Sequence, residues 1–172
     1  MNDVRWLSAE EQEIWRAYLS ATVAFSAHID RQMRQDSGMP MAYYEILVRL
    51  SEAPHRRLRM SELADVSLSS RSRLSHAVAA LERNGWVERR PADGDRRGWV
   101  CSLTDDGYAA LAEAAPGHVT TVREHIFDVL TPEQLQCLRD IGLAISAGLR
   151  TQCAAAQAED AESAESTADC DA

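Results

Sequence analysis

One pair of strand-like runs interrupts a chain whose remaining apolar patterns are helical. The two runs cover residues 86–90 and 98–103, and the turn residues Pro91, Asp93 and Gly94 lie between them. Two short runs separated by such residues are typical of a β-hairpin. We therefore expect a mostly α-helical fold with one small β-hairpin, whose tip is long and charged.

Apolar residues recur every three or four positions through most of the remaining chain, which is the spacing of a buried helix face. Short alternation at Arg57-Leu58-Arg59 predicts a further, small strand. Pro116 and Gly117 predict a kink in the helix that contains them, because proline removes a backbone donor. The expected helices cover residues 8–37, 43–50, 61–64, 69–83, 104–129 and 131–149.

Several expected helix ends carry capping residues. Ser8 and Glu11, like Thr131 and Gln134, have the spacing of a capping box, in which two side chains satisfy free backbone N–H groups. Thr104 is placed to cap the helix that follows the hairpin. Two further helices are expected to end at Gly38 and Gly85.

Charge is distributed unevenly along the 172 residues. The chain has 18 basic residues, all of them arginine, and 27 acidic ones. The resulting net charge of −9 argues at first against nucleic-acid binding. Residues 51–100, however, hold ten arginines and seven acidic residues, whereas residues 151–172 hold six acidic residues and no arginine. We therefore expect a basic middle segment between acidic flanks.

The last residues differ in composition from the rest of the chain. Residues 151–172 contain no aromatic and no branched aliphatic side chain. Such a segment cannot bury enough apolar surface to offset the entropy lost on ordering. We expect a single domain over residues 1–150 and a disordered acidic tail over residues 151–172.

Several classes of protein lack support in the sequence. No run approaches the roughly 18 apolar residues of a membrane span, and the first residues lack the apolar core of a signal peptide. We therefore expect a cytoplasmic protein without membrane contact. A nucleophile elbow, a glycine-rich phosphate loop and a His-Glu-x-x-His motif are missing from the sequence, so we do not expect an enzyme. The sequence indicates no cofactor and no metal site.

The middle segment has the order of a winged helix-turn-helix: two helices joined by a short turn, then the hairpin. The second helix of this motif lies in the major groove of DNA. Serine and arginine can bond to phosphates and base edges, and arginine also enters narrow minor grooves. A solvated helix face and a charged turn are the alternatives. The candidate DNA contacts are Ser69, Ser70, Arg71, Ser72, Arg73 and His76 in the helix, and Arg90, Asp95, Arg96 and Arg97 in the hairpin.

Four segments of this region match a known pattern. They are Ser61-Glu62-Leu63-Ala64, residues 81–89 (LERNGWVER), Asp95-Arg96-Arg97 and residues 100–107 (VCSLTDDG). Together they resemble the winged helix-turn-helix core of the multiple antibiotic resistance regulator (MarR) family. The resemblance covers about residues 8–150 and does not include the acidic tail.

The resemblance implies a homodimer that binds a pseudo-palindromic operator in double-stranded DNA and represses nearby genes. It places the winged helix-turn-helix at about residues 40–103 and the dimerisation helices at about residues 8–37 and 104–150. By the same analogy Arg97 enters the minor groove, steadied by Asp95, and the helix from Ser69 reads the major groove.

The resemblance also implies a small-molecule effector. Many members of the family bind a small aromatic or phenolic acid in a cleft beside the dimerisation helices, and the ligand releases DNA. Tryptophan and tyrosine would supply a stacking surface, and arginine would bind a carboxylate. Ordinary core or interface positions are the alternative for these residues. The candidates are Trp15, Arg16, His28, Tyr43 and Tyr44.

Two other functions stay open at this point. One is a redox- or metal-responsive regulator of the same fold, although peroxide-sensing relatives use a cysteine in the first helix and this chain has none before Cys101. The other is a helical dimerisation scaffold without DNA binding. The cysteines and histidines show no close metal-binding spacing; they are Cys101, Cys137, Cys153 and Cys170, and His28, His55, His76, His118 and His125.

Overall fold

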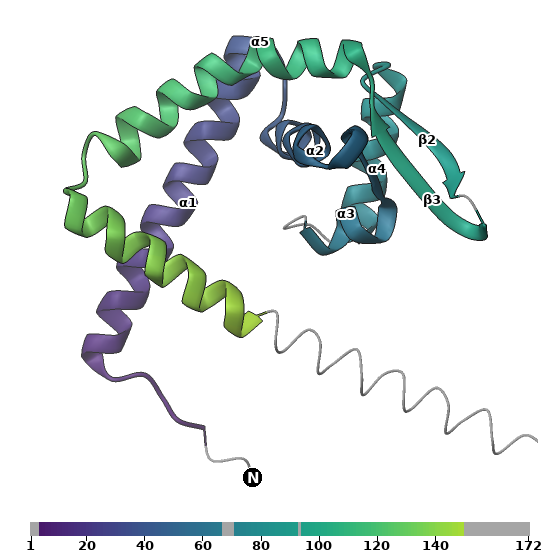
Figure 1. Ribbon diagram of the computed structural model, residues 1–172. Helices are drawn as coiled ribbons and strands as arrows, with labels where there is room; N and C mark the ends of the chain where they lie inside the picture. The colour runs from purple at the N-terminus through teal and green to yellow at the C-terminus, as the bar shows by residue number, and fades with distance from the viewer. Residues whose placement is uncertain (1–3, 67–70, 93, 150–172) are drawn as a thin grey trace, which may run out of the picture. The chain divides into compact units, whose positions relative to one another are not determined.

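Helices make up most of the computed structural model, which describes residues 4–66, 71–92 and 94–149 (Figure 1). This confirms the predicted mostly helical fold. The expected tail over residues 151–172 lies outside the described residues. The helices are α1 (Ala9–Ser37), α2 (Met41–Glu52), α3 (Met60–Val66), α4 (Arg71–Arg83), α5 (Asp105–Val122) and a last helix over residues 132–149.

Three short strands form the antiparallel sheet of the described chain, in the order β1-β3-β2. They are β1 (Arg57–Arg59), β2 (Val87–Ala92) and β3 (Asp95–Leu103). Figure 1 shows β2 and β3 as a hairpin that projects beside α4. Pairing continues to Ala92 and Asp95, with an irregularity after Pro91, so the strands run further toward the tip than the sequence predicts. Gly94 has a φ of 76°, which permits the tight turn.

The chain divides into two compact units, Met1–His125 and Ile126–Ala172. The core of the first unit lies among α2, α3, α4 and the sheet. Apart from Met39, which lies in the connection from α1 to α2, its most deeply buried side chains come from the helical stripes and from the strands, as the apolar spacing requires. They are Met39, Leu47, Leu50, Leu63, Leu74, Val78, Leu81, Val87 and Cys101.

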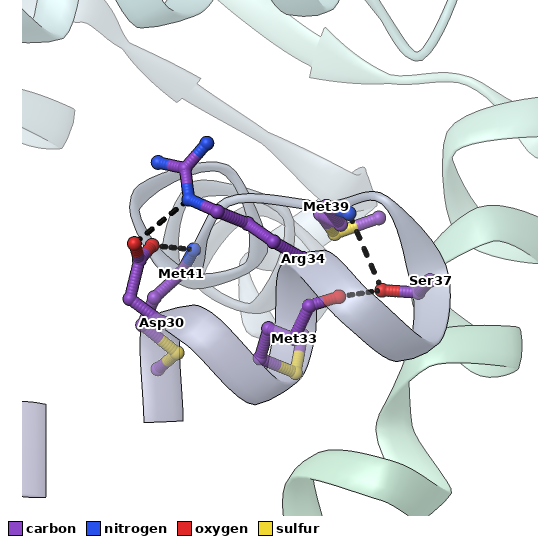
Figure 2. Close-up of polar contacts among 6 residues, drawn as sticks. All are labelled: Asp30, Met33, Arg34, Ser37, Met39 and Met41. Carbon is purple, nitrogen blue, oxygen red and sulfur yellow. Dashed lines mark hydrogen bonds and ion pairs between the residues drawn. The ribbon is translucent and has the colours of Figure 1, made fainter. Parts of the chain in front are cut away.

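The connection from α1 to α2 is held by side chains of α1 (Figure 2). Asp30 accepts a hydrogen bond from the Met41 backbone N–H at 2.9 Å and another from Arg34 Nε at 2.8 Å. Ser37 accepts a bond from the Met39 backbone N–H at 3.4 Å. The bond from Arg34, together with the bond from Met41, lowers the pKa of Asp30. Because Met41 is the first residue of α2, Asp30 caps that helix from a neighbouring one.

The predicted helix ends are confirmed where the signal is local. Ser8 and Glu11 form the complete capping box of α1, and Thr131 and Gln134 exchange the same pair of bonds. Gly38 and Gly85 both adopt positive φ.

The third helix begins earlier than the sequence predicts. The expected start was Ser61, whereas α3 begins at Met60. The Glu62 carboxylate accepts a hydrogen bond from the Arg59 backbone N–H at 2.8 Å, so Glu62 satisfies a free backbone donor at the start of this helix.

The helix after the hairpin departs from the expected geometry. Pro116 lies inside α5, which continues as an α-helix to Val122, and a π-helical segment follows at Arg123–Phe127. His125 Nδ1 lies 3.0 Å from the Thr121 carbonyl oxygen. The imidazole nitrogen thus lies within hydrogen-bond distance of a backbone carbonyl oxygen at the start of this irregularity.

The base of the hairpin is closed by Thr104, which confirms its predicted role as the cap of α5. Its hydroxyl accepts from the Gly107 N–H at 3.0 Å and donates to the Gly85 carbonyl oxygen at 2.7 Å. Its own N–H donates to the Trp86 carbonyl oxygen at 3.1 Å. The first turn of α5 therefore lies directly against the chain that enters β2.

Gly107→Ala is expected to destabilise the protein by about 3 kcal/mol, because an added Cβ would overlap the Trp86 carbonyl oxygen. Gly117→Ala in the same helix is the matched control, since its Cβ would meet only the Asp36 side chain, at 3.1 Å. Chemical denaturation compares the free energies of unfolding. Equal stability of the two variants would contradict the close packing at Gly107.

Candidate nucleic-acid interface

The helix α4 separates its apolar and polar side chains. Leu74, Val78 and Leu81 are buried, whereas Ser72, Arg73 and His76 are exposed, as the sequence predicts. Ser69 and Ser70 lie outside the described residues. For Arg71 the backbone at the start of α4 is described and the side chain is not.

The hairpin supplies the other candidate contacts. Arg90 is exposed on β2, and its Nη2 lies 2.7 Å from Glu88 Oε2. Asp95 is the first residue of β3. Arg96 and Arg97 follow it in the strand, where their backbones are described and their side chains are not.

Asp95 is bound to an arginine that the sequence does not single out. Arg59 Nη1 of β1 lies 3.1 Å from Asp95 Oδ2. A pairing of Asp95 with Arg97 stays a prediction, because that side chain lies outside the described part of the structure. The register of β1 on β3 pairs Arg59 with Val100, which is five residues from Asp95, so the strand pattern alone does not indicate this ion pair.

A second ion pair connects α4 with the hairpin. Glu82 accepts from Arg89 Nε at 3.0 Å, from Nη2 at 2.5 Å and from the Arg89 backbone N–H at 3.3 Å. The hydrogen bonds from Arg89 hold the pKa of Glu82 below its ordinary value and raise that of Arg89. Glu82 therefore fixes both the backbone and the side chain of β2 at this position.

A hollow of about 690 Å³ lies between α4 and the hairpin. Ser75 and Glu82 of α4 line one side, and Arg89, Asp95 and Trp99 line the other. The residues of both ion pairs therefore line the same hollow. Of the candidate DNA contacts, Asp95 is the one that lines this hollow among the described side chains.

The candidate effector residues fall into two separate groups. Trp15 lies with its ring centroid 5.9 Å from that of Tyr18, and Arg16 Nη2 donates to Gln12 at 3.0 Å. His28 is further along the same helix by about 20 Å, given a rise of 1.5 Å per residue. Within one chain, Trp15 and Arg16 therefore lie apart from the other candidates, His28, Tyr43 and Tyr44.

Aromatic rings of α1 and α2 each meet a histidine of α5 or of the π-helical segment that follows it. The ring centroids of His28 and His125 are 4.4 Å apart, and those of Tyr44 and His118 are 4.5 Å apart. His118 Nδ1 is buried and has no hydrogen-bond partner among the described residues. Burial lowers the pKa of His118 and raises that of Tyr44. Tyr43 is half-buried against the core.

The sequence does not predict these ring contacts. It places His118 and His125 on one face of a helix, but their partners on α1 and α2 are remote in the chain. Periodicity within one helix carries no information about which ring of another helix faces it.

The thiols do not favour the redox alternative. Cys101 is fully buried in β3, and burial raises its pKa to about 12, so the reactive thiolate is scarce near neutral pH. Cys137 is exposed, and Cys153 and Cys170 lie outside the described residues. Within the described ranges no three histidine, cysteine or acidic side chains gather as metal ligands.

Similarity to known proteins covers most of the chain. The model of the MarR family matches residues 37–98. The uncharacterized HTH-type transcriptional regulator YfiV of Bacillus subtilis is 32% identical over 143 residues, which are 81% of this chain and 84% of YfiV. The transcriptional repressor MprA of Escherichia coli is 32% identical over 85 residues, which are 49% of this chain and 48% of MprA.

A solved structure of a DNA complex also resembles the chain. Sco3205, a MarR family transcriptional regulator from Streptomyces coelicolor crystallised with DNA, is 52% identical with a TM-score of 0.81, over 84% of this chain and 91% of Sco3205.

None of the described helices combines the length and apolar character needed to cross a membrane.

Glu82→Gln is expected to lower the free energy of unfolding at pH 7 by up to about 1 kcal/mol, because the pair with Arg89 is partly exposed. The folded-state pKa of Glu82 is depressed, so its contribution is present above the ordinary pKa of 4.5 and is lost as pH falls. The difference between variant and parent should therefore shrink from pH 7 to pH 3.5.

Glu88→Gln is the control for this measurement. Glu88 pairs with Arg90 at a more exposed site, so its removal should change stability little at either pH. A Glu82 variant as stable as the parent at pH 7 would contradict the assigned role.

Proposed function

The chain belongs to the MarR family of DNA-binding transcriptional regulators, and we propose that it is a homodimeric repressor that binds a pseudo-palindromic operator and is released by a small aromatic acid. Its relatives are transcriptional regulators and not enzymes. The observation that carries the proposal is the exposed polar face of α4 beside an arginine-bearing hairpin.

We assign the DNA contacts to the start of α4 and to the hairpin. Ser72, Arg73 and His76 are exposed on α4, and a helix of this width can enter the major groove. Arg97 follows the turn of the hairpin, where a guanidinium can reach the minor groove. The likeness to Sco3205, a structure with DNA, supports this assignment. Ser69, Ser70, Arg71, Arg90 and Arg96 complete the proposed contact set, with Asp95 as a positioning group.

Homodimerisation is supported by uncovered apolar side chains. The α1 residues Ile14, Trp15 and Val23 are each at least half exposed in the single chain. Such residues on a soluble protein mark a surface that another protein covers. The last helix carries a comparable set: Leu138, Ile141, Leu143, Ile145 and Leu149.

Repression is supported by the likeness to MprA, which is named a transcriptional repressor. The effector is proposed to lie beside α1, where Tyr44 faces His118 of α5 and His28 faces His125 of the π-helical segment. His118 Nδ1, which is buried and has no hydrogen-bond partner in the described part of the chain, offers a polar atom for a ligand. Trp15 and Arg16 stay candidates for a second contact group.

Arg97→Ala should weaken binding to the DNA flanking the gene across all sequences and make the salt dependence shallower by about one phosphate contact. Arg73→Ala should instead relax preference at particular base pairs, by roughly 1–3 kcal/mol. Mobility shifts at rising salt measure both, and the parent should bind with two chains per operator.

Arg83→Ala is the matched control, because Arg83 lies at the opposite end of α4. Absence of parent binding even at low salt would favour a dimerisation scaffold. Unchanged binding by the Arg97 variant would contradict the assignment of the hairpin.

An effector should raise the melting temperature and also dissociate the protein from DNA, because a ligand that binds one state better shifts the population toward it. A thermal-shift screen of aromatic acids, followed by mobility shifts with each stabilising compound, measures both effects. His28→Ala should reduce the thermal shift. Compounds that stabilise the protein but leave DNA bound would count against release by an aromatic acid.

A further inference from the structure

Asp95, near the tip of the hairpin, forms an ion pair with a residue of the short strand β1. Its Oδ2 lies 3.1 Å from Nη1 of Arg59, a residue that immediately precedes α3. The tip is otherwise the part of the hairpin most distant from the helices (Figure 1). This ion pair therefore ties the tip to the helix-turn-helix.

We propose that Arg59 is a positioning residue for DNA binding, which holds the hairpin tip through Asp95 in the geometry that the DNA requires. This inference rests on the proposed function, because it assumes that the hairpin contacts DNA. The pair links a residue at the start of α3 to the strand that carries Arg97. Loss of the pair would release the tip without removing a DNA contact.

Gly98 supplies the space in which Asp95 takes this position. A Cβ at residue 98 would lie 2.5 Å from Asp95 Oδ2 and 3.0 Å from its Cγ. The Asp95 side chain is short, so it could escape such a contact only by turning away from its present site. An alanine at position 98 should therefore displace the carboxylate from Arg59 without any change of charge.

The base and the tip of the hairpin are held by different pairs. Glu82 of α4 binds Arg89 near the base of β2, whereas Arg59 of β1 binds Asp95 near the tip. Both pairs are partly exposed, and exposed ion pairs contribute little to global stability. Their effect is to restrict the hairpin locally, which reduces the entropy lost when it docks on DNA.

Arg57 provides a matched control. It lies two residues before Arg59 on β1, so its side chain leaves the same face of the strand. It carries the same charge and is paired in register with Ser102, away from Asp95. Among the described residues Arg57 forms no ion pair, so its removal changes local charge without affecting the hold on the tip.

Amide hydrogen exchange of the full chain without DNA tests whether the pair of Arg59 with Asp95 restrains the hairpin tip. Arg59→Ala and Gly98→Ala should both accelerate exchange in peptides over residues 88–99, while peptides of α1 keep the rate of the parent. Arg57→Ala should leave the hairpin peptides unchanged. Unaltered exchange in both Arg59→Ala and Gly98→Ala would overturn the proposal, whether or not the protein binds DNA.

DNA affinity tests the consequence. Arg59→Ala should weaken operator binding about fivefold, the range expected for loss of one preorganised contact, with the salt dependence of the parent retained. In an Asp95→Asn background the same substitution should have no further effect. If Arg59→Ala still weakens DNA affinity in the Asp95→Asn background, and the salt dependence becomes shallower by about one phosphate contact, Arg59 contacts a phosphate directly. That result would overturn the positioning role.

The two proposals fail in different ways. Absence of DNA binding by the parent protein contradicts the proposed function, and hydrogen exchange still decides whether Arg59 holds the tip. Operator binding that is strong in the parent and equally strong in Arg59→Ala leaves the regulator intact and overturns the role of Arg59.

Discussion

The hydrogen bonds of Thr104 set the geometry on which the rest of the first unit depends. One residue closes the hairpin through the Trp86 carbonyl oxygen, caps α5 through the Gly107 N–H and binds the Gly85 carbonyl oxygen at the end of α4. Three elements thus meet at one residue, through its backbone N–H and its hydroxyl. Since Gly107 lies against Trp86, α5 can leave the hairpin in only a narrow range of directions.

Features encoded within a few residues could be predicted from the sequence. The boxes at Ser8 and Thr131 and the cap at Thr104 each require only a donor, an acceptor and the correct spacing. The glycine at the end of α4 requires only a residue that tolerates positive φ. The same holds for the exposed positions of α4, because helical periodicity alone separates them from Leu74 and its neighbours. The DNA contacts assigned to those positions remain a proposal.

Contacts between distant segments could not be predicted. The partner of Asp95 is 36 residues away in β1, and the ring facing Tyr44 comes from α5. Single-sequence periodicity specifies a face but not what packs against it. The π-helical segment at Arg123–Phe127 could not be predicted either. The sequence predicts an irregularity at Pro116, whereas the structure has it further along the helix, beside the contact between His125 and the Thr121 carbonyl oxygen.

The internal pairing of arginines has a consequence for specificity. In the basic middle segment Arg56, Arg59 and Arg89, which are outside the proposed contact set, each face a carboxylate of the same chain. Arginines neutralised in this way release fewer counterions from arbitrary DNA, and counterion release supplies most non-specific affinity. The protein would spend less time on random sites of a genome than its arginine count suggests, which raises the ratio of operator to background occupancy.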